Sequence, residues 1–400
     1  MKWEKVAIKD ICTGIYDGPH ATPPLSDTGA IFLGISNFKN GRLDFSDIRY
    51  ISEDDLPKWT KRVIPQKNDI VFSYEATLNL YAIIPEGFRG CLGRRMALLR
   101  VDETKADYKF LYYYFYSDAW RATVNENIVL GATVDRIPLI KFPDFPVELP
   151  PLETQHRIAD ILSAYDDLIE NNQKQIKLLE EAAQRLYKEW FVDLRFPGHE
   201  NTKIVDGVPE GWQWCKVRDI ADINSSALPK NYKEDFIDYV DLGSVRCGHI
   251  ETRTRYNLNE APGRAKRCAK DGDIIWGMVR PNLKAYALVT NPKETDVFST
   301  GFAVLSAKKV PYSYLYCAVT QEEFVGYLVN ATNGAAYPAV KPVHFEVADI
   351  LKPDDKVLEQ FHSVADSIYR KKEALENQNH NLSEARDLLL PKLMRGEVEV

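Results

Sequence analysis

Asp17 and His20, in the segment YDGPHATPP, are residues whose types and spacing could form an acid/base pair. A carboxylate beside an imidazole can hold or transfer a proton during catalysis. Gly-Pro and Pro-Pro steps surround the two residues, which predicts an exposed loop, and no nucleophile with a partner base accompanies them. The segment therefore favours loop structure or ligand contact over catalysis.

Other catalytic signatures are missing or have the wrong spacing. No GxxxxGK[ST] phosphate loop occurs, and GFRGCLG at 87–93 precedes an apolar strand-like run, so it is better interpreted as a turn than as a dinucleotide fingerprint. A nuclease of the PD…(D/E)xK type is not supported, since ETK at 103–105 has no suitably placed PD and PDDK at 353–356 is too compressed. We expect no catalytic residue in this chain.

The cysteines give no sign of a metal centre. They lie singly, with no CxxC pair and no His at ligand spacing, at Cys12, Cys91, Cys215, Cys247, Cys268 and Cys317. Isolated cysteines of this kind indicate reduced thiols rather than a disulfide framework or a zinc site. We therefore expect a cytoplasmic protein that holds no metal.

Composition is that of an ordinary globular protein. Of 400 residues, 45% are hydrophobic and 27% are charged, and this length suggests two or three domains. The chain has no run of about 18 apolar residues, and its start, MKWEKVAIKD, has no apolar segment of a signal peptide. Neither a membrane span nor secretion is expected.

The net charge of −7 is concentrated in two segments. Residues 1–150 carry 19 basic and 20 acidic side chains, and residues 196–353 carry 19 of each. Residues 151–195 carry 6 basic and 9 acidic side chains, and residues 354–400 carry 7 and 10. Any contact with nucleic acid must therefore come from local basic clusters and not from bulk charge.

An internal repeat organises the whole sequence. Matching stretches recur in the same order at offsets between 203 and 209 residues: WEKVAIKDI with WQWCKVRDI, NDIVF with GDIIW, YKFLY with YSYLY, and GATVDRIPLIKF with GAAYPAVKPVHF. Each copy reads as a β-rich region followed by a long helix. The predicted domains are two β-rich regions, 1–150 and 196–353, and two helical segments, 151–195 and 354–400.

The aromatic run FLYYYFY at 110–116 has two interpretations. Exposed aromatic side chains on strands or loops can stack on nucleic-acid bases. The repeat partner of the run, YSYLYCAVTQEEFVGYL, has helical spacing. A core helix is therefore favoured over a base-stacking platform.

Both helical segments carry a heptad pattern. In the first, apolar residues fall at alternating steps of four and three, with Asn172 as a polar member; in the second, Lys371 and Gln378 are the polar members. The alternative is two unrelated amphipathic helices, each packed on its own domain. The heptad instead predicts a pairing surface formed by Leu162, Ile169, Asn172, Ile176, Leu179, Ile368, Leu375, Gln378 and Leu382.

Taken together, these stretches resemble one protein family, the specificity (S) subunit of type I DNA restriction-modification enzymes. The resemblance covers essentially the whole chain and rests on VELPPLETQHRIADIL before the first helix, the restart GVPEGWQWCKV, the ending LLLPKLMRGEVEV, and DGPHATPP followed by IFLGISNFKNG. DIIWGMVRPNLKAYALV is similar to another class of target-recognition domain. The sequence departs from the family's usual pattern in two places. Thr154 and His156 are unusual in the segment LPPLETQH before the first helix, and the matching segment of the second copy, ILKPDDKVLEQF, lacks the Pro-Pro pair.

The resemblance implies a fold and a set of partners. The fold is α+β, with two similar target-recognition domains separated by two long helices that form an antiparallel coiled coil, in a pseudo-twofold tandem repeat. The function is non-catalytic reading of a bipartite, asymmetric sequence in double-stranded DNA. Two modification (methyltransferase) subunits dock on the helices, restriction subunits (endonuclease and translocase) join them, and S-adenosylmethionine, ATP and Mg²⁺ belong to those partners, with no cofactor in this chain.

Candidate DNA contacts fall in two groups. Phosphate contacts are expected from the Lys-Arg pair that precedes each xDI(V/I) stretch and from its neighbours, although a solvated charged turn is the alternative: Lys58, Lys61, Arg62, Arg264, Lys266, Arg267 and Lys270. Base-edge readers are expected among polar loop residues: Asp17, His20, Thr22, Ser36, Asn37, Arg94, Arg95, Ser244, Arg280, Asn282, Lys284, Ser299 and Thr300, with Tyr74 and Tyr337 as minor contributors.

If the helices run antiparallel with aligned midpoints, Asn172 and Gln378 share one layer. A polar layer in a coiled coil costs stability but fixes register. A competing hypothesis of another class is a coiled-coil scaffold whose β domains bind proteins, and a third is a fused nuclease or methylase. Specific duplex binding separates the first two, and activity of the chain alone would indicate the third.

Overall fold

The computed structural model describes residues 3–130, 134–332 and 338–400, so Tyr337 lies outside the described residues. The chain divides into two compact units, one of residues 1–171 with 378–400 and one of residues 172–377. Both boundaries fall within long helices, so each unit contains a segment of each helix. In the described part of the chain, no helix is long and apolar enough to cross a membrane.

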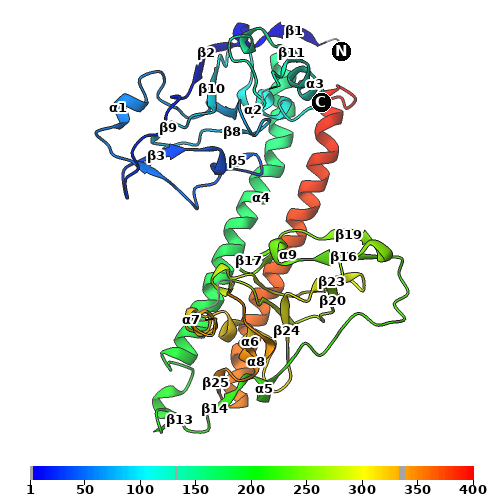
Figure 1. The fold of residues 1–400 in the computed structure, drawn as a ribbon. Coiled ribbons are helices and arrows are strands. Elements are labelled where there is room, and N and C mark those ends of the chain that lie inside the picture. The colour runs from blue at the N-terminus through cyan, green and yellow to red at the C-terminus, as the bar shows by residue number, and fades with distance from the viewer. Residues whose placement is uncertain (1–2, 131–133, 333–337) are drawn as a thin grey trace. The chain divides into compact units, whose positions relative to one another are not determined.

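The first unit is built on two sheets (Figure 1). An antiparallel sheet has the order β2-β10-β7-β8 and comprises β2 (Cys12–Asp17), β10 (Met96–Val101), β7 (Ile70–Ser73) and β8 (Tyr81–Ile83). The second sheet has the order β6-β3-β9, with β3 parallel to β9, and comprises β6 (Tyr50–Ile51), β3 (Ala30–Leu33) and β9 (Gly90–Leu92). Two further strand pairs and three short helices complete it: β1 (Glu4–Ala7) with β11 (Pro146–Leu149), β4 (Phe38–Lys39) with β5 (Arg42–Leu43), α1 (Leu56–Trp59), α2 (Tyr108–Tyr114) and α3 (Asp118–Asn127).

The second unit repeats this topology. Its antiparallel sheet has the order β15-β24-β21-β22: β15 (Ala221–Ile223), β24 (Phe302–Ala307), β21 (Ile274–Gly277) and β22 (Tyr286–Leu288). Its other sheet again has one parallel pair, β16 with β23, and adds β20: β19 (Thr254–Asn257), β16 (Phe236–Val240), β23 (Asp296–Ser299) and β20 (Ala265–Arg267). The remaining elements are β14 (Gln213–Lys216) with β25 (Asp349–Lys352), β17 (Val245–Arg246) with β18 (His249–Ile250), β12 (Ile204–Val205) with β13 (Val208–Pro209), α5 (Val217–Ile220), α6 (Tyr312–Val319), α7 (Glu322–Asn330) and α8 (Pro342–Glu346). The matching strand order confirms the duplication.

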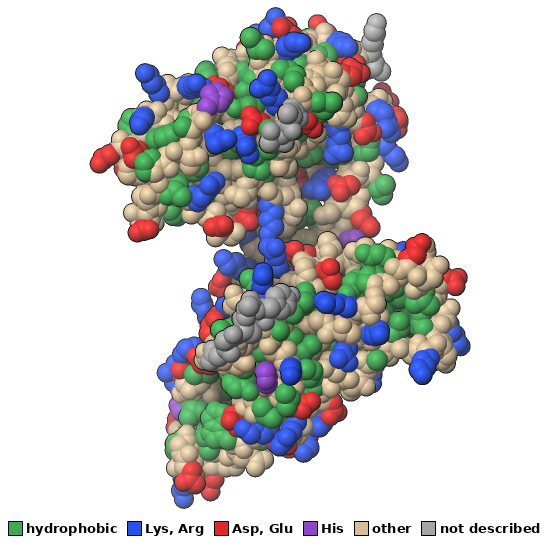
Figure 2. Space-filling view, in the orientation of Figure 1, with side chains coloured by type: hydrophobic (Ala, Val, Ile, Leu, Met, Phe, Trp, Pro, Cys, Tyr) green, Lys and Arg blue, Asp and Glu red, His purple; other side chains and the backbone are tan. Residues whose placement is uncertain are grey.

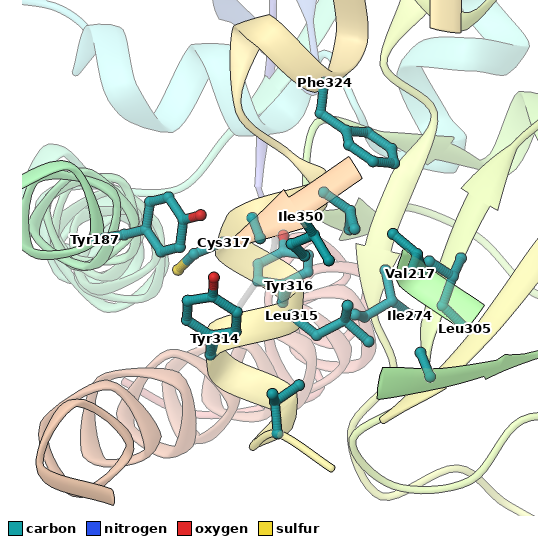
Figure 3. Close-up of a cluster of buried hydrophobic side chains, with 14 of the residues drawn as sticks. Tyr187, Val217, Ile274, Leu305, Tyr314, Leu315, Tyr316, Cys317, Phe324 and Ile350 are labelled. Atoms are coloured by element: carbon teal, nitrogen blue, oxygen red, sulfur yellow. The ribbon is translucent and has the colours of Figure 1, made fainter. Parts of the chain in front are cut away.

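The aromatic runs form core helices, as predicted. In α2, Phe110 and Leu111 are fully buried, and the Asp107 side chain accepts a hydrogen bond from the Phe110 amide, which caps the helix. In α6, the Tyr314 hydroxyl donates to the Leu351 carbonyl. Figure 3 shows Tyr314 and its neighbours on α6 among side chains from the surrounding strands. Each such buried aromatic stabilises the fold by about 1.5–3 kcal/mol, so these residues hold the sheets against the long helices.

The long helices are α4 (Leu152–Tyr187), which ends in a π-turn at Lys188–Val192, and α9 (Asp355–Met394). Within the second unit, Glu180 pairs with Lys372 at 3.1 Å, and the rings of Tyr187 and Phe361 lie 6.3 Å apart. The later residue on α4, Tyr187, contacts the earlier residue on α9, Phe361, so the two helix segments run antiparallel.

The same helix pairing occurs within the first unit. Asp166 pairs with Arg386 at 2.5 Å, and Leu162 and Leu393 are fully buried in one core cluster. The last turns of α9 therefore complete the hydrophobic core around the N-terminal sheets.

The predicted pairing surface holds on α4 but not throughout α9. Leu162, Asn172 and Ile176 are buried, and Ile169 and Leu179 are half-buried. On α9 the buried residues of the second unit are Val357, Leu358, Phe361, Ala365, Tyr369, Lys372, Glu373 and Leu375. Ile368 and Leu382 are half-buried, whereas Val364, Lys371 and Gln378 are exposed.

The shift on α9 has a physical cause. Tyr369 packs against α6, with its ring 5.4 Å from that of Tyr316 and its hydroxyl 3.0 Å from the Cys317 sulfur, and it belongs to the same core cluster as Ala183 and Tyr187 of α4. Because α9 packs against both α4 and α6, a wider face of the helix is buried than in a coiled coil of two helices, where only the heptad positions are buried. The pairing of Asn172 with Gln378 stays a prediction, because these residues belong to different units.

A charged cluster lies where β18 meets the helices of the second unit. The imidazole of His249 contacts Glu376 at 2.8 Å and Glu180 at 3.3 Å, and the Lys372 ammonium lies 3.2 Å from Glu376 and 3.1 Å from Glu180. Hydrogen bonds to Glu180 and Glu376 raise the pKa of His249 from 6.5 to about 9. Burial alone would raise the pKa of both carboxyls, but His249 and Lys372 together hold it below its usual value.

This raised pKa predicts a pH-dependent contribution to stability. A histidine whose pKa is higher in the folded state stabilises the fold fully below its unfolded pKa of 6.5, and the contribution disappears as pH rises through about 9. The thermal midpoint of His249→Gln should therefore lie well below wild type at pH 6 and approach it by pH 10. A difference in midpoint that is constant across this range, measured by circular dichroism, would contradict the assignment.

Candidate nucleic-acid interface

The candidate site in the first unit forms at one end of the antiparallel sheet. In the order β2-β10-β7, the end of β2, the start of β10 and the end of β7 lie at the same edge, because neighbouring strands run in opposite directions. The Gly18 amide donates to the Met96 carbonyl at 2.8 Å, and the Tyr74 amide donates to the Arg95 carbonyl at 3.1 Å. Residues far apart in sequence, Asp17, Tyr74 and Arg95, are thereby brought to one edge.

Asp17 anchors the charged side chains there. Its carboxylate lies 2.9 Å from the His20 imidazole and forms an ion pair with Arg62, whose guanidinium also donates to the Gly18 carbonyl at 3.3 Å. Burial, together with the nearby Asp17 carboxylate, raises the pKa of the largely buried Tyr74 phenol. Asp17 thus holds both the His20 imidazole and the Arg62 guanidinium at this sheet end.

Arg95 adopts a backbone conformation that non-glycine residues rarely use. Its φ of 101° lies in the left-handed region, within the turn that carries the chain from β9 in one sheet to β10 in the other. The side chain pairs with Glu75 at 3.2 Å. Backbone strain of this kind costs on the order of 1–3 kcal/mol and is concentrated at functional sites. The turn thus holds Arg95 beside the exposed Arg94 at the sheet end.

A cavity of about 380 Å³ opens beside this turn. Its lining residues are Thr22, Phe32, Gly34, Ile35, Ser36, Arg49, Gly93, Arg94, Arg95 and Met96. Three guanidinium groups and two hydroxyls line it and no carboxylate does, so it suits groups that accept hydrogen bonds, such as guanine edges or phosphate oxygens. The structure therefore brings together four sequence-predicted residues, Thr22, Ser36, Arg94 and Arg95.

Arg49 was missed by sequence reasoning. Its guanidinium carbon lies 5.0 Å from the centre of the Phe32 ring, in cation–π contact. In the sequence it stands alone before the two-residue strand β6, with no basic neighbour and no turn motif. Its positive charge was the only available signal.

The second unit presents the equivalent edge. The Met278 amide donates to the Gly301 carbonyl at 2.9 Å, and the Thr300 amide donates to the Arg264 carbonyl at 2.8 Å. The loop after β21 has left-handed conformations at both Arg280 and Lys284, with φ of 50° and 53°. Arg280 and Asn282 are exposed, whereas the Lys284 ammonium pairs with Glu322 at 2.5 Å. The predicted residues Arg264, Arg280, Asn282 and Thr300 therefore lie in loops that follow or precede the strands at this edge.

Asn37, Ser244 and Ser299, predicted as base readers, are buried and hydrogen-bonded within their own turns. The buried Asn37 side chain accepts from the Gly34 amide at 2.8 Å and donates to the Asp44 and Asp47 carbonyls at 3.1 and 3.2 Å. Ser244, at the equivalent position of the second unit, is buried against the Asp241 carboxylate, to which its hydroxyl donates at 2.8 Å. Ser299 accepts from the Gly301 amide at 3.1 Å. A buried polar group fully used in this way cannot turn outward without leaving its partners unpaired.

The repeated Lys-Arg pairs have different surroundings. Lys61 and Lys266 are exposed, as are the neighbouring residues Lys58, Arg264 and Lys270. Arg62 is tied to Asp17, and Arg267 is half-buried on β20. On the face drawn in Figure 2, Lys and Arg side chains are interspersed with Asp and Glu, so no continuous basic surface is visible there.

The described residues form no metal centre. Within those residues, no group of three or more His, Cys, Asp and Glu side chains could hold a metal ion. All six cysteines are free, and burial raises the pKa of the Cys91 and Cys317 thiols to about 12. The structure thus presents two copies of one β-rich domain, each with cationic and polar loops at one sheet end.

Comparison with known proteins gives matches to one family. Residues 1–181 match the family model described as the type I restriction modification DNA specificity domain. The first 181 residues are therefore similar to this domain, and relatives named as type I restriction enzyme specificity subunits match most of the chain.

Relatives in this family match most of the chain. The chain is 26% identical over 369 residues to the type I restriction enzyme MjaIX specificity subunit of Methanocaldococcus jannaschii, covering 88% of this chain and 82% of that protein. It is 25% identical over 357 residues to the MjaVIII specificity subunit of the same organism, covering 85% and 81%. The S subunit from M. genitalium shares the fold, with a TM-score of 0.60, 16% identity, and 98% and 96% coverage.

The structural role of Asn37 leads to a direct test. Asn37→Ala should lower the free energy of unfolding by about 1–3 kcal/mol, because it leaves the Gly34 amide and two carbonyls without their partner. The neighbouring exposed residue provides the control, since Ser36→Ala should change stability by less than about 0.5 kcal/mol. Urea denaturation measures both, and equal stabilities of the two variants would contradict the structural role.

Proposed function

We propose that this chain is the DNA-sequence-recognition subunit of a type I restriction-modification complex and reads a bipartite, asymmetric target. The main observation behind the proposal is that the two units share one topology but differ in the loops at one end of the antiparallel sheet. We call this sheet end, described above for each unit, the reading edge. A shared frame with divergent loops suits two domains that read different half-sites of one duplex. The similarity of the chain to type I restriction enzyme specificity subunits supports the same function.

Each reading edge combines two kinds of DNA contact. The arginine-lined cavity and the turn at Arg94 and Arg95 read base edges in the first half-site, and the loop at Arg280 and Asn282 reads the second. Exposed lysines such as Lys61 and Lys266 neutralise phosphates. Base contacts then supply sequence preference, while phosphate contacts fix the position of each domain on the duplex.

The catalytic steps belong to partner subunits in this proposal. Two modification subunits bind the helical segments and transfer methyl groups to adenine from S-adenosylmethionine. Restriction subunits join them and cleave DNA in an ATP- and Mg²⁺-dependent reaction. The complex acts in the cytoplasm, and this chain contributes recognition without a cofactor of its own.

Selection of genomic fragments tests the proposal. The chain is purified with its modification subunits, incubated with sheared genomic DNA, and the retained fragments are sequenced. A single bipartite motif should be enriched. If neither the chain nor its complex prefers any duplex, the recognition function is wrong and a protein-binding scaffold becomes the better account.

The phosphate role of Lys61 gives a second test. Lys61→Ala should weaken binding to all duplexes alike and lower the slope of log affinity against log salt concentration by about one unit. Lys67→Ala is the matched control, because this exposed lysine is already paired with Glu86 at 2.9 Å. Fluorescence anisotropy over a range of salt concentrations measures both slopes. A loss of discrimination at one base with an unchanged slope would contradict the phosphate role.

A further inference from the structure

Two small hairpins occupy equivalent places in the two units. The β4–β5 hairpin carries Arg42, and the β17–β18 hairpin carries His249 at the matching position, 207 residues later. Each hairpin is separate from the two main sheets of its unit. Both project a cationic side chain onto the long helices, and neither residue was singled out by the sequence.

In the first unit, the hairpin is attached to α4. The Arg42 guanidinium forms an ion pair with Glu170 and donates to the Asp166 carbonyl at 2.7 Å. The Gly41 carbonyl in the hairpin turn accepts a hydrogen bond from the Tyr112 hydroxyl at 2.7 Å. The Asp166 carboxylate in turn accepts from Tyr113 at 2.6 Å. The hairpin therefore contacts both the spacer helix and the core helix α2.

The second unit repeats this attachment on α9. His249 contacts Glu376, which lies 206 residues after Glu170 and is therefore its repeat counterpart. The Gly248 carbonyl, counterpart of Gly41, accepts from the Lys372 ammonium at 2.8 Å. Because the pKa of His249 is raised to about 9, its imidazole is positively charged at neutral pH, as Arg42 is.

Glycine is required at both hairpin turns. Gly41 and Gly248 have φ of 77° and 93°, in the left-handed region. A Cβ on Gly41 would lie 2.4 Å from the Tyr112 hydroxyl, and one on Gly248 would lie 3.0 Å from the Tyr316 hydroxyl. Tyr112 and Tyr316 are themselves repeat counterparts. The close contact between the hairpin glycine and a tyrosine hydroxyl is therefore present in both units, although their loops at the sheet end differ.

We infer that Arg42 and His249 are positioning residues that lock each reading domain to its spacer helix and thereby fix the number of unspecified base pairs between the half-sites. The inference rests on the proposed function. Successive base pairs are about 3.4 Å apart along the duplex, so a small tilt of one domain on its helix moves its reading edge to a neighbouring register. A second attachment point, away from the hydrophobic core contacts, opposes that tilt.

Methylation mapping tests this inference in cells that contain the chain and its modification subunits. The genomic motif of the wild type is determined by long-read sequencing of modified adenine, and plasmids then carry that motif with the spacer shortened or lengthened by one base pair. Arg42→Ala or His249→Ala should raise methylation of the altered spacers relative to the original by roughly fivefold, the discrimination that an ion pair of this exposure supports. The sequence preference within each half-site should be unchanged.

Control variants separate positioning from general damage. Lys39→Ala and Arg246→Ala lie on the same hairpins, on the strands opposite Arg42 and His249, and should keep a single spacer length. The exchange Arg42→Glu with Glu170→Arg should restore the wild-type spacer by reversing the ion pair. Thermal denaturation checks that each variant is folded.

Two results would overturn the inference. One is that the Arg42 and His249 variants methylate only the original spacer, and the other is that they lose a base preference within one half-site. A wild-type chain that yields no bipartite motif would instead refute the proposed function itself, so the two failures are distinguishable.

Discussion

The rest of the structure depends on the antiparallel contact between α4 and α9 within each unit. Asp166 pairs with Arg386 in one unit, and Glu180 pairs with Lys372 in the other. The repeat relates Asp166 to Lys372 and Glu180 to Arg386, both at an offset of 206, so the two pairs are equivalent with their charges exchanged. In both units α4 supplies the acid and α9 the base. Two copies of α4 in the same arrangement would place Asp166 against Glu180, so the charges favour pairing of unlike helices.

This contact makes each unit discontinuous in sequence. Leu393 and Met394, at the end of the chain, are buried in the core of the N-terminal unit together with Ile158 and Leu162. The hydrophobic core of the first unit is therefore complete only when the C-terminal end of α9 is packed into it. The reading edges carry strained turns at Arg95, Arg280 and Lys284, which the packed frame holds in position. Sequence preference can change in these loops without loss of the frame that positions them.

The duplication and the long helices could be predicted because both follow from periodicity. The repeat offset and the heptad steps are visible in a single sequence. The buried face of α9 could not be predicted, since Tyr369 and Lys372 are buried by contacts with α6 and the β17–β18 turn that are distant in sequence. Asn37 and Ser244 look like polar loop residues in the sequence, but their side chains turn inward and bond to groups of their own turns, which residue type alone does not indicate. Asp17, Arg62 and Tyr74 were predicted as separate DNA contacts, and the ion pair between Asp17 and Arg62 could not be predicted because it depends on the strand order.

The central claim is that each unit reads one half of a bipartite DNA target independently. Replacing residues 1–150 with the corresponding segment of a specificity subunit of known target, followed by genome-wide mapping of methylated adenine, tests it most directly. The account predicts that one half-site changes to that of the donor while the other half-site is retained. A motif that is unchanged, or one in which both half-sites change together, would contradict it.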